Sequence, residues 1–139
     1  MPAAALHLIK LSVGTEDTDD LARWQKQRLK ETGRLFHRTR MQPKRDAELL
    51  AGGSIYWVIR GLVRCRQRLA GFDRILDDEG RPLTLLLLDR KLVLVEPVPH
   101  RAFQGWRYLD SARAPRDLTG GAGELPAALA AALRQLGAW

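Results

Sequence analysis

The stretch from Leu62 to Ala70 places the strongest constraint on what this chain can fold into. Apolar residues occupy one set of alternate positions and arginines occupy the other: Val63, Cys65 and Leu69 against Arg64, Arg66 and Arg68. Because successive side chains of a β-strand point to opposite faces, this pattern predicts a strand with one apolar and one cationic face. We therefore expect a β-sheet that packs a core against the apolar face and leaves the arginines on the other.

Other segments predict further strands and three helices. Short apolar or alternating runs indicate strands at Leu6–Val13, Leu35–Met41, Ser54–Arg60, Leu83–Leu88, Leu92–Val95 and Phe103–Leu109. The fourth and fifth of these are expected to form a buried hairpin through Asp89-Arg90-Lys91. Helices are expected from Thr15 to a stop at Gly33, over 44–51 after Pro43, and over about 125–137 after Pro126. The combination predicts an α+β fold.

Length and composition indicate one domain over residues 1–139. The 139 residues are 45% hydrophobic and 28% charged, which is ordinary for a globular domain. The longest apolar run, Leu83–Leu88, is too short to cross a bilayer, and no basic region of a secretory signal begins the chain. A single cysteine, Cys65, cannot form an internal disulfide. These features predict a cytoplasmic protein without a membrane partner.

Positive charge is concentrated in the middle of the sequence. The formal net charge is +7, and the segment from Arg23 to Arg74 holds 14 basic and 4 acidic residues. The rest of the chain is mildly acidic. A basic segment beside an acidic remainder is typical of proteins that bind nucleic acid or another anion. A solvated, arginine-rich surface is the alternative explanation.

The alternating arginines are the strongest candidates for an anion site. Alternate residues of a strand lie about 7 Å apart, so Arg64, Arg66 and Arg68 form a row suited to successive phosphates. The structural alternative is neutralisation by acidic residues of neighbouring segments, namely Asp73, Asp77, Asp78 and Glu79. Aromatic residues with basic neighbours are expected near the row: Tyr56 and Trp57 beside Arg60, and Trp106 beside Arg107 and Tyr108. We expect Trp24 and Trp57 to pack in the core and Trp106 to be exposed or to line a pocket.

Motifs of common catalytic and metal sites are missing from the sequence. The histidines at positions 7, 37 and 100 have no companion ligands at metal-binding spacing. Gly52 and Gly53 match no phosphate-binding loop, and Ser54 lies outside a nucleophile-elbow motif. Cys65 occupies an apolar strand face, where a thiol is usually inert. We therefore expect no metal, no cofactor and no catalytic residue.

Several runs of the chain resemble a known bacterial family. They are Leu6-His7-Leu8-Ile9-Lys10, Thr39-Arg40-Met41-Gln42-Pro43-Lys44-Arg45, Gly52-Gly53-Ser54-Ile55-Tyr56-Trp57-Val58-Ile59-Arg60-Gly61, Arg66-Gln67-Arg68 and Phe103-Gln104-Gly105-Trp106-Arg107-Tyr108-Leu109. These runs resemble the uncharacterised bacterial domain of unknown function 1489, and the resemblance extends to about Leu118. It implies a family and no activity.

A more distant resemblance implies a function. A strand, a proline, a short helix with Glu48-Leu49-Leu50, a glycine and a strand that ends in arginine are similar to the opening of PUA-like domains, particularly the ASCH branch. Such domains are small β-barrels that bind RNA or modified nucleobases, and a few ASCH members hydrolyse an acylated cytidine. Their lysine and acidic residue after the glycine are replaced here by Ser54 and Trp57, so the resemblance implies binding rather than hydrolysis.

Together, these observations predict a PUA-like mixed β-barrel flanked by short helices, with its core over about 6–118. The chain is expected to be a monomer or a weak homodimer that binds RNA or a nucleotide without catalysis. The residues expected to bind fall into three groups by role. Phosphate is assigned to Arg40, Lys44 and Arg45, with the basic surface extended by Arg60, Arg64, Arg66, Arg68 and Arg107. Base stacking is assigned to Trp106 with Trp57 or Tyr56, and hydrogen bonds to the base edge are assigned to Ser54 and Gln104.

Two other functions stay open from the sequence. The first is an enzyme that acts on a nucleoside or small anion, with Ser54, His37 or Asp73 taking part. A closed pocket that holds one of these beside Trp57 or Trp106 would favour it, whereas an open arginine face would not. The second is a module whose basic face meets an acidic protein.

Overall fold

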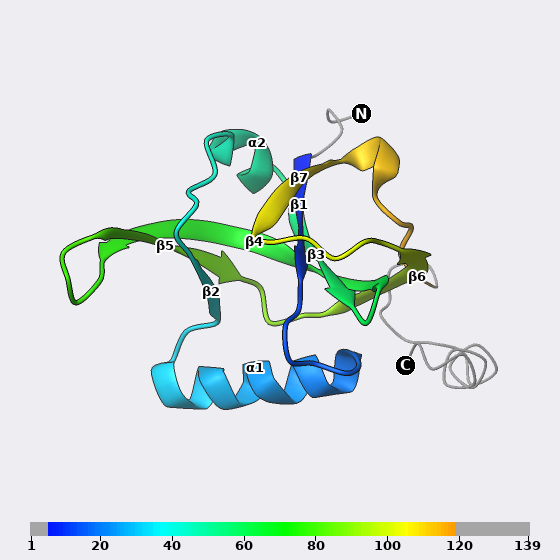
Figure 1. Cartoon of the computed structure of the whole chain (residues 1–139), viewed down its shortest axis with the longest axis horizontal. Coiled ribbons are helices and arrows are strands. Elements are labelled where there is room, and N and C mark those ends of the chain that lie inside the picture. The colour runs from blue at the N-terminus through cyan, green and yellow to red at the C-terminus, as the bar shows by residue number, and fades with distance from the viewer. Residues whose placement is uncertain (1–5, 119–139) are drawn as a thin grey trace.

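The computed structural model describes residues 6–118 and shows an α+β fold (Figure 1). Its elements are β1 (Leu6–Leu11), α1 (Thr18–Thr32), β2 (Phe36–Thr39), α2 (Asp46–Leu50), β3 (Ser54–Ile59), β4 (Leu62–Leu76), β5 (Pro82–Leu88), β6 (Val93–Pro99) and β7 (Trp106–Asp110), followed by a 3₁₀ turn at Ser111–Arg113. All seven predicted strands and the first two predicted helices are present, with shifted ends. The third predicted helix, over about 125–137, lies outside the described residues.

The strands form one mixed, seven-stranded sheet in the order β2-β5-β4-β3-β1-β7, with β6 paired to β4. β1 and β3 are parallel, and the other pairs are antiparallel. Within residues 6–118, the end strands β2 and β7 do not pair with each other. The sheet is therefore open, and the predicted barrel is not confirmed.

The predicted hairpin between β5 and β6 is wrong. Both strands pair with β4, at successive stretches of this long strand. β6 pairs with the stretch from Leu62 to Arg66, and β5 pairs with the stretch from Leu69 to Leu76. The loop at Asp89 therefore carries the chain along β4 from one stretch to the next.

A β-bulge at Arg64 interrupts the alternation of β4. Cys65 lies opposite Trp57 on β3 and Val63 lies opposite Val58, so Arg64 is the extra residue of β4 at this point. The extra residue reverses the direction of the side chains. Val63 packs with Val58 in one core cluster, and Cys65 packs with Trp57 in another. The expectation that Val63 and Cys65 share one face is therefore wrong.

Helix α1 has the ends that its sequence predicts. Asp17 caps its N-terminus by accepting a hydrogen bond of 2.7 Å from the Asp20 N–H. Gly33 ends it in the left-handed region with φ of 76°. Leu21 and Gln25 are buried on the side of α1 that faces the sheet. In Figure 1, α1 and α2 lie at opposite sides of the sheet as viewed, and α1 closes one end of the core that contains Trp57.

Candidate functional site

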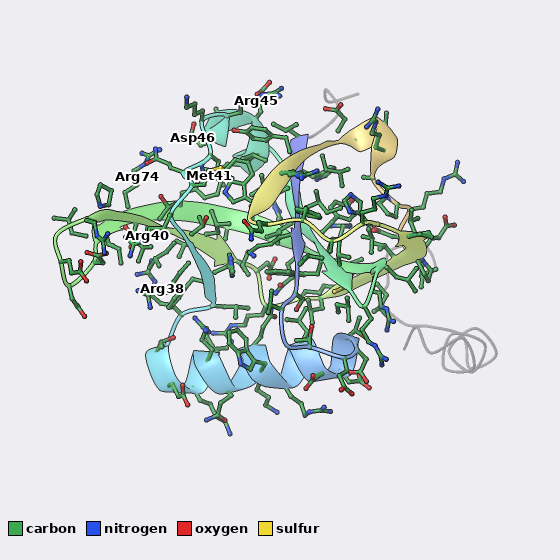
Figure 2. The ribbon with its side chains drawn as sticks, in the orientation of Figure 1. Arg38, Arg40, Met41, Arg45, Asp46 and Arg74 are labelled. Carbon is green, nitrogen blue, oxygen red and sulfur yellow. The ribbon has the colours of Figure 1, made fainter. Side chains whose placement is uncertain are left out.

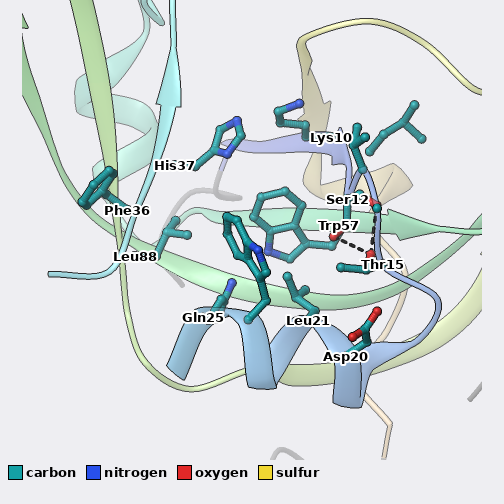
Figure 3. Close-up of a pocket in the computed structure, with 14 residues that line it drawn as sticks. Lys10, Ser12, Thr15, Asp20, Leu21, Gln25, Phe36, His37, Trp57 and Leu88 are labelled. Atoms are coloured by element: carbon teal, nitrogen blue, oxygen red, sulfur yellow. Dashed lines mark hydrogen bonds between the residues drawn. The ribbon is translucent and has the colours of Figure 1, made fainter. Parts of the chain in front are cut away.

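A cavity of about 240 Å³ lies between α1, β2 and the ends of β1 and β3 (Figure 3). Its walls combine aromatic rings, hydroxyl groups and a few charged groups. The lining includes Lys10, Ser12, Thr15, Asp20, Leu21, Trp24, Gln25, Phe36, His37, Trp57 and Leu88. This is somewhat smaller than the pockets that hold drug-sized molecules, so it suits a ligand of about the size of a base or nucleoside.

Lys10 is placed in this pocket by the alternation of β1. Leu6 and Leu8 of the same strand face are buried in the core, and Lys10 is the next residue on that face. It lies opposite Trp57 on β3 and opposite Trp106 on β7. No residue within 6–118 forms an ion pair or hydrogen bond with its amine, and burial lowers the pKa of Lys10. The pocket thus contains an ammonium group without a counter-ion among the described residues.

His37 occupies the same side of the pocket as Lys10 (Figure 3). Its ring meets the Trp57 ring edge to face, with centroids 5.7 Å apart. Burial, followed by the charges of Lys10 and Arg28, lowers the pKa of His37 to about 4. The imidazole is therefore neutral at pH 7 and can accept a hydrogen bond or a proton.

The floor of the pocket is held by a buried network of amides. Trp57 Nε1 donates to Gln67 Oε1 at 2.9 Å. Gln25 and Gln67 exchange a pair of hydrogen bonds of 2.7 and 2.8 Å, and Gln67 Nε2 also donates to the Asp89 carbonyl. Because these side chains are fully engaged, the Trp57 ring has a fixed position under the cavity.

An exposed tryptophan and an arginine lie at the pocket margin. Trp24 is 54% exposed, and the Arg28 guanidinium lies 4.1 Å from its ring centroid. The same guanidinium lies 5.3 Å from the Phe36 ring. A pair of neighbouring hydroxyl groups is also present. Thr15 Oγ1 donates to Ser12 Oγ at 2.7 Å and lies 2.9 Å from the Ser12 carbonyl oxygen. This margin offers a flat aromatic surface beside a positive charge.

The aromatic residues predicted to stack a base are buried. Trp106 is 5% exposed, and its Nε1 donates to the Met41 carbonyl at 2.6 Å. Tyr56 and Trp57 are each 4% exposed, although Trp57 contributes to the pocket floor. The predictions for Trp24 and Trp106 are thus both wrong: Trp24 is exposed and Trp106 is packed. Trp106 is buried because β7 pairs with β1 and carries it onto the core face.

The three arginines of β4 do not form an exposed row. Arg64 is 3% exposed at the bulge, and Arg68 is exposed. Arg66 donates two hydrogen bonds to Asp117, of 2.7 and 2.6 Å, and a third to Ser54 Oγ. Neutralisation of Arg66 therefore occurs, but through Asp117 rather than through the predicted acidic residues near position 77.

Ser54 lies with Arg66 and His7, and it does not line the pocket. Its backbone N–H donates to His7 Nδ1 at 3.0 Å, so His7 Nδ1 is unprotonated. His7 Nε2 lies 3.2 Å from Ser111 Oγ. Burial, followed by the charge of Arg66, lowers the pKa of His7. Ser54, which is 1% exposed, is not available to a ligand at the surface.

Figure 2 labels three arginines near α2 that form ion pairs, namely Arg40, Arg45 and Arg74, the last with Asp46. Arg40 binds Asp77 at 2.6 Å, and Arg45 binds Glu48. Asp73 forms an ion pair with Arg34 at 3.1 Å and does not line the pocket. The remaining predicted binding residues are exposed and separate from it: Lys44, Arg60, Gln104 and Arg107.

Sequence reasoning missed Lys10, Trp24 and Arg28 as site residues. A signal for Lys10 was present, since it follows Leu6 and Leu8 in the alternation of a strand and so takes a core-facing position. For Trp24 and Arg28, the spacing of four residues places both on one side of α1, as observed. Only the packing of α1 against the sheet decides that this side is exposed.

Comparison with known proteins identifies the family. The family model described as "Protein of unknown function (DUF1489)" matches residues 8–139. The chain belongs to this family. No curated protein and no solved structure matches the chain. The DUF1489 match agrees with the resemblance noted from the sequence, and it carries no activity with it.

Two further observations on the described part of this DUF1489 chain concern metal ions and membranes. Among residues 6–118, no group of three or more His, Cys, Asp or Glu side chains is arranged to hold a metal ion. None of the described helices has the length and apolar character needed to cross a membrane.

Proposed function

We propose that the pocket binds a nucleotide, free or at the end of an RNA strand, without catalysing a reaction. The observation that carries this proposal is the combination of aromatic walls with the Lys10 amine, which has no counter-ion among the described residues. A nucleotide supplies a planar base for the aromatic walls and a phosphate for the amine. The hydroxyls of Ser12 and Thr15 and the neutral His37 can hydrogen-bond to base or sugar.

The charge of the whole chain supports an anionic ligand. The formal net charge is +7, and Arg28 adds a second cation beside the pocket margin. The distant similarity to PUA-like domains, which bind RNA or modified nucleobases, remains part of the proposal. The proposed site differs from the basic strand face expected from the sequence, because Arg64 and Arg66 are buried or paired.

Calorimetric titration with the four 5′-mononucleotides and with short single-stranded RNA tests this proposal. We expect micromolar binding of at least one of them. Lys10→Gln should weaken it by about tenfold, as loss of a charge-assisted hydrogen bond implies. Lys44→Gln is the matched control, because Lys44 is exposed, lies outside the pocket and loses the same charge. Equal losses in both variants, or no binding to any of these ligands, would exclude the pocket as a nucleotide site.

A reaction on a nucleoside is the second candidate, because His37 lies beside Trp57 within the pocket. Its imidazole is neutral at pH 7 and so is able to accept a proton, which a general base must do. The other candidates for catalysis are elsewhere, since Ser54 bonds Arg66 and Asp73 bonds Arg34. Incubation with acylated and unmodified nucleosides, followed by chromatography, tests it. Turnover that His37→Gln abolishes would establish the enzyme, and unchanged nucleosides would leave the binding function.

A further inference from the structure

The Lys10 amine lies in surroundings that favour its neutral, nucleophilic form. β1 presents it on the core-facing side of the sheet, between positions occupied by Trp57 and Trp106. The cavity beside it is walled mainly by apolar and aromatic groups. Loss of hydration without a counter-ion favours the neutral amine, which is the reactive form. Burial lowers the pKa of Lys10 accordingly.

A proton acceptor lies near this amine. Figure 3 shows Lys10 and His37 on the same side of the pocket, and the charge of Lys10 contributes to keeping His37 neutral. The other charged groups around this pair come from α1, namely Asp20 and Arg28. Asp20 is engaged with Arg23 at 3.3 Å. Lys10 and His37 therefore form a nucleophile and a base in one cavity.

We propose that Lys10 forms an imine with an aldehyde or ketone carried by a planar ligand in this pocket. The lone pair of Nζ attacks the carbonyl carbon, and the π electrons of the carbonyl move to its oxygen. His37 takes a proton from the nitrogen and returns it to the oxygen. Loss of water then gives the C=N bond, so that amine and carbonyl compound yield imine and water. This covalent step goes beyond the non-covalent binding proposed above. It uses the same pocket, and it does not depend on the binding of a nucleotide.

Selective labelling of the wild-type protein tests this proposal directly. The protein is pulsed at pH 7.5 with pyridoxal 5′-phosphate, which is a planar aromatic aldehyde, and the imine is trapped with borohydride. Peptide mapping by mass spectrometry then gives the labelling rate of each lysine. We expect Lys10 to react several-fold faster than exposed Lys26, Lys30 and Lys44, since a lowered pKa raises the fraction of neutral amine. A Lys10 rate no higher than theirs would overturn the proposal.

Two variants test the roles of the residues. Lys10→Arg keeps the positive charge and should remove the fast label while leaving the other lysines unchanged. His37→Gln should slow the labelling of Lys10 alone by about threefold or more, as expected for loss of a general base. An unchanged Lys10 rate in His37→Gln would overturn the proton transfer by His37.

The nucleotide proposal and the imine proposal fail in different ways. Fast labelling of Lys10 in a protein that binds no nucleotide supports the imine and contradicts only the nucleotide. Nucleotide binding with slow labelling of Lys10 contradicts only the imine. Protection of Lys10 from the aldehyde by a bound mononucleotide would support both, because it places both ligands in one pocket.

Discussion

At the scale of single residues, His37 makes the stability of the protein depend on pH. Its pKa is about 4 in the folded chain and 6.5 in the unfolded one, so the unfolded state binds a proton first as the pH falls. Above pH 6.5, His37 does not change the free energy of unfolding with pH. Between pH 6.5 and pH 4, its protonation in the unfolded state lowers that free energy by about 1.4 kcal/mol per pH unit. His7, whose pKa is also lowered, adds a loss of the same sign.

Urea unfolding between pH 7 and pH 4.5 measures this dependence. His37→Phe should reduce the slope of unfolding free energy against pH, and the slope that remains should come from His7 and the carboxylates. An equal slope in the variant and the wild type would contradict the assignment to His37.

Gly53 is a second residue whose identity depends on its surroundings, because the backbone packed around it leaves no space for a side chain. A Cβ at this position would lie 2.2 Å from the Leu6 carbonyl oxygen and 2.4 Å from the Leu49 carbonyl oxygen. Both are backbone atoms that cannot move away alone, so Gly53→Ala should cost about 3 kcal/mol or more. Gly71→Ala is the control, because its Cβ would meet only Leu87 Cδ1 at 3.5 Å. Thermal unfolding of both variants compares them, and similar midpoints would refute the argument.

At the scale of elements, β4 shows where sequence patterns succeed and fail. Its alternation correctly predicts a strand around Leu62 to Ala70, and Asp17 and Gly33 mark the ends of α1. The bulge at Arg64 depends on pairing with β3, which is invisible in a local pattern. The extra residue removes Arg64 from the expected arginine row, and Asp117 neutralises Arg66, so the row does not form.

Contacts between elements explain the role of Arg66 better than its position in a row. Its two hydrogen bonds to Asp117 join β4 to the segment after the 3₁₀ turn, where Val95 and Asp117 form a β-bridge. Because both side chains are partly buried, Arg66→Gln should lower the unfolding free energy by about 1–2 kcal/mol. Arg45→Gln removes an exposed pair with Glu48 and should leave the midpoint unchanged. A midpoint for Arg66→Gln equal to that of wild type would contradict this role.

At the scale of the whole molecule, the α+β class can be predicted from the sequence. Whether the sheet closes into a barrel or stays open cannot. Strands and helices are indicated by local periodicity, as for β1 and α1. Strand order depends on contacts between distant segments, such as β1 with β7. The pocket depends on the same long-range pairing, because it forms only where β2 and α1 cover the end of β1. Lys10 could be inferred as core-facing, but its neighbours His37 and Trp24 could not.

The distribution of charge over the molecule predicts the salt dependence of its binding to a polyanion such as RNA. Arginines such as Arg74 and Arg81 are engaged in ion pairs, whereas Lys26 and Lys30 of α1 form none within residues 6–118. Only cations that are not already neutralised release counterions on binding, with a slope of about −0.7 per contact on single strands. The double variant Lys26→Gln/Lys30→Gln should therefore flatten the plot of log K against log salt for single-stranded RNA by about 1.4.

The double variant Arg74→Gln/Arg81→Gln removes the same charge and serves as the control for this salt dependence. Its slope should stay close to that of wild type, because these guanidinium groups already face Asp46, Asp77 and Glu79. Fluorescence anisotropy over a salt series measures both. Equal flattening by the two double variants would mean that net charge alone governs the interaction. Flattening by the lysine variant only, with mononucleotide affinity unchanged, would place the RNA strand along α1, next to the pocket that we propose for its terminal base.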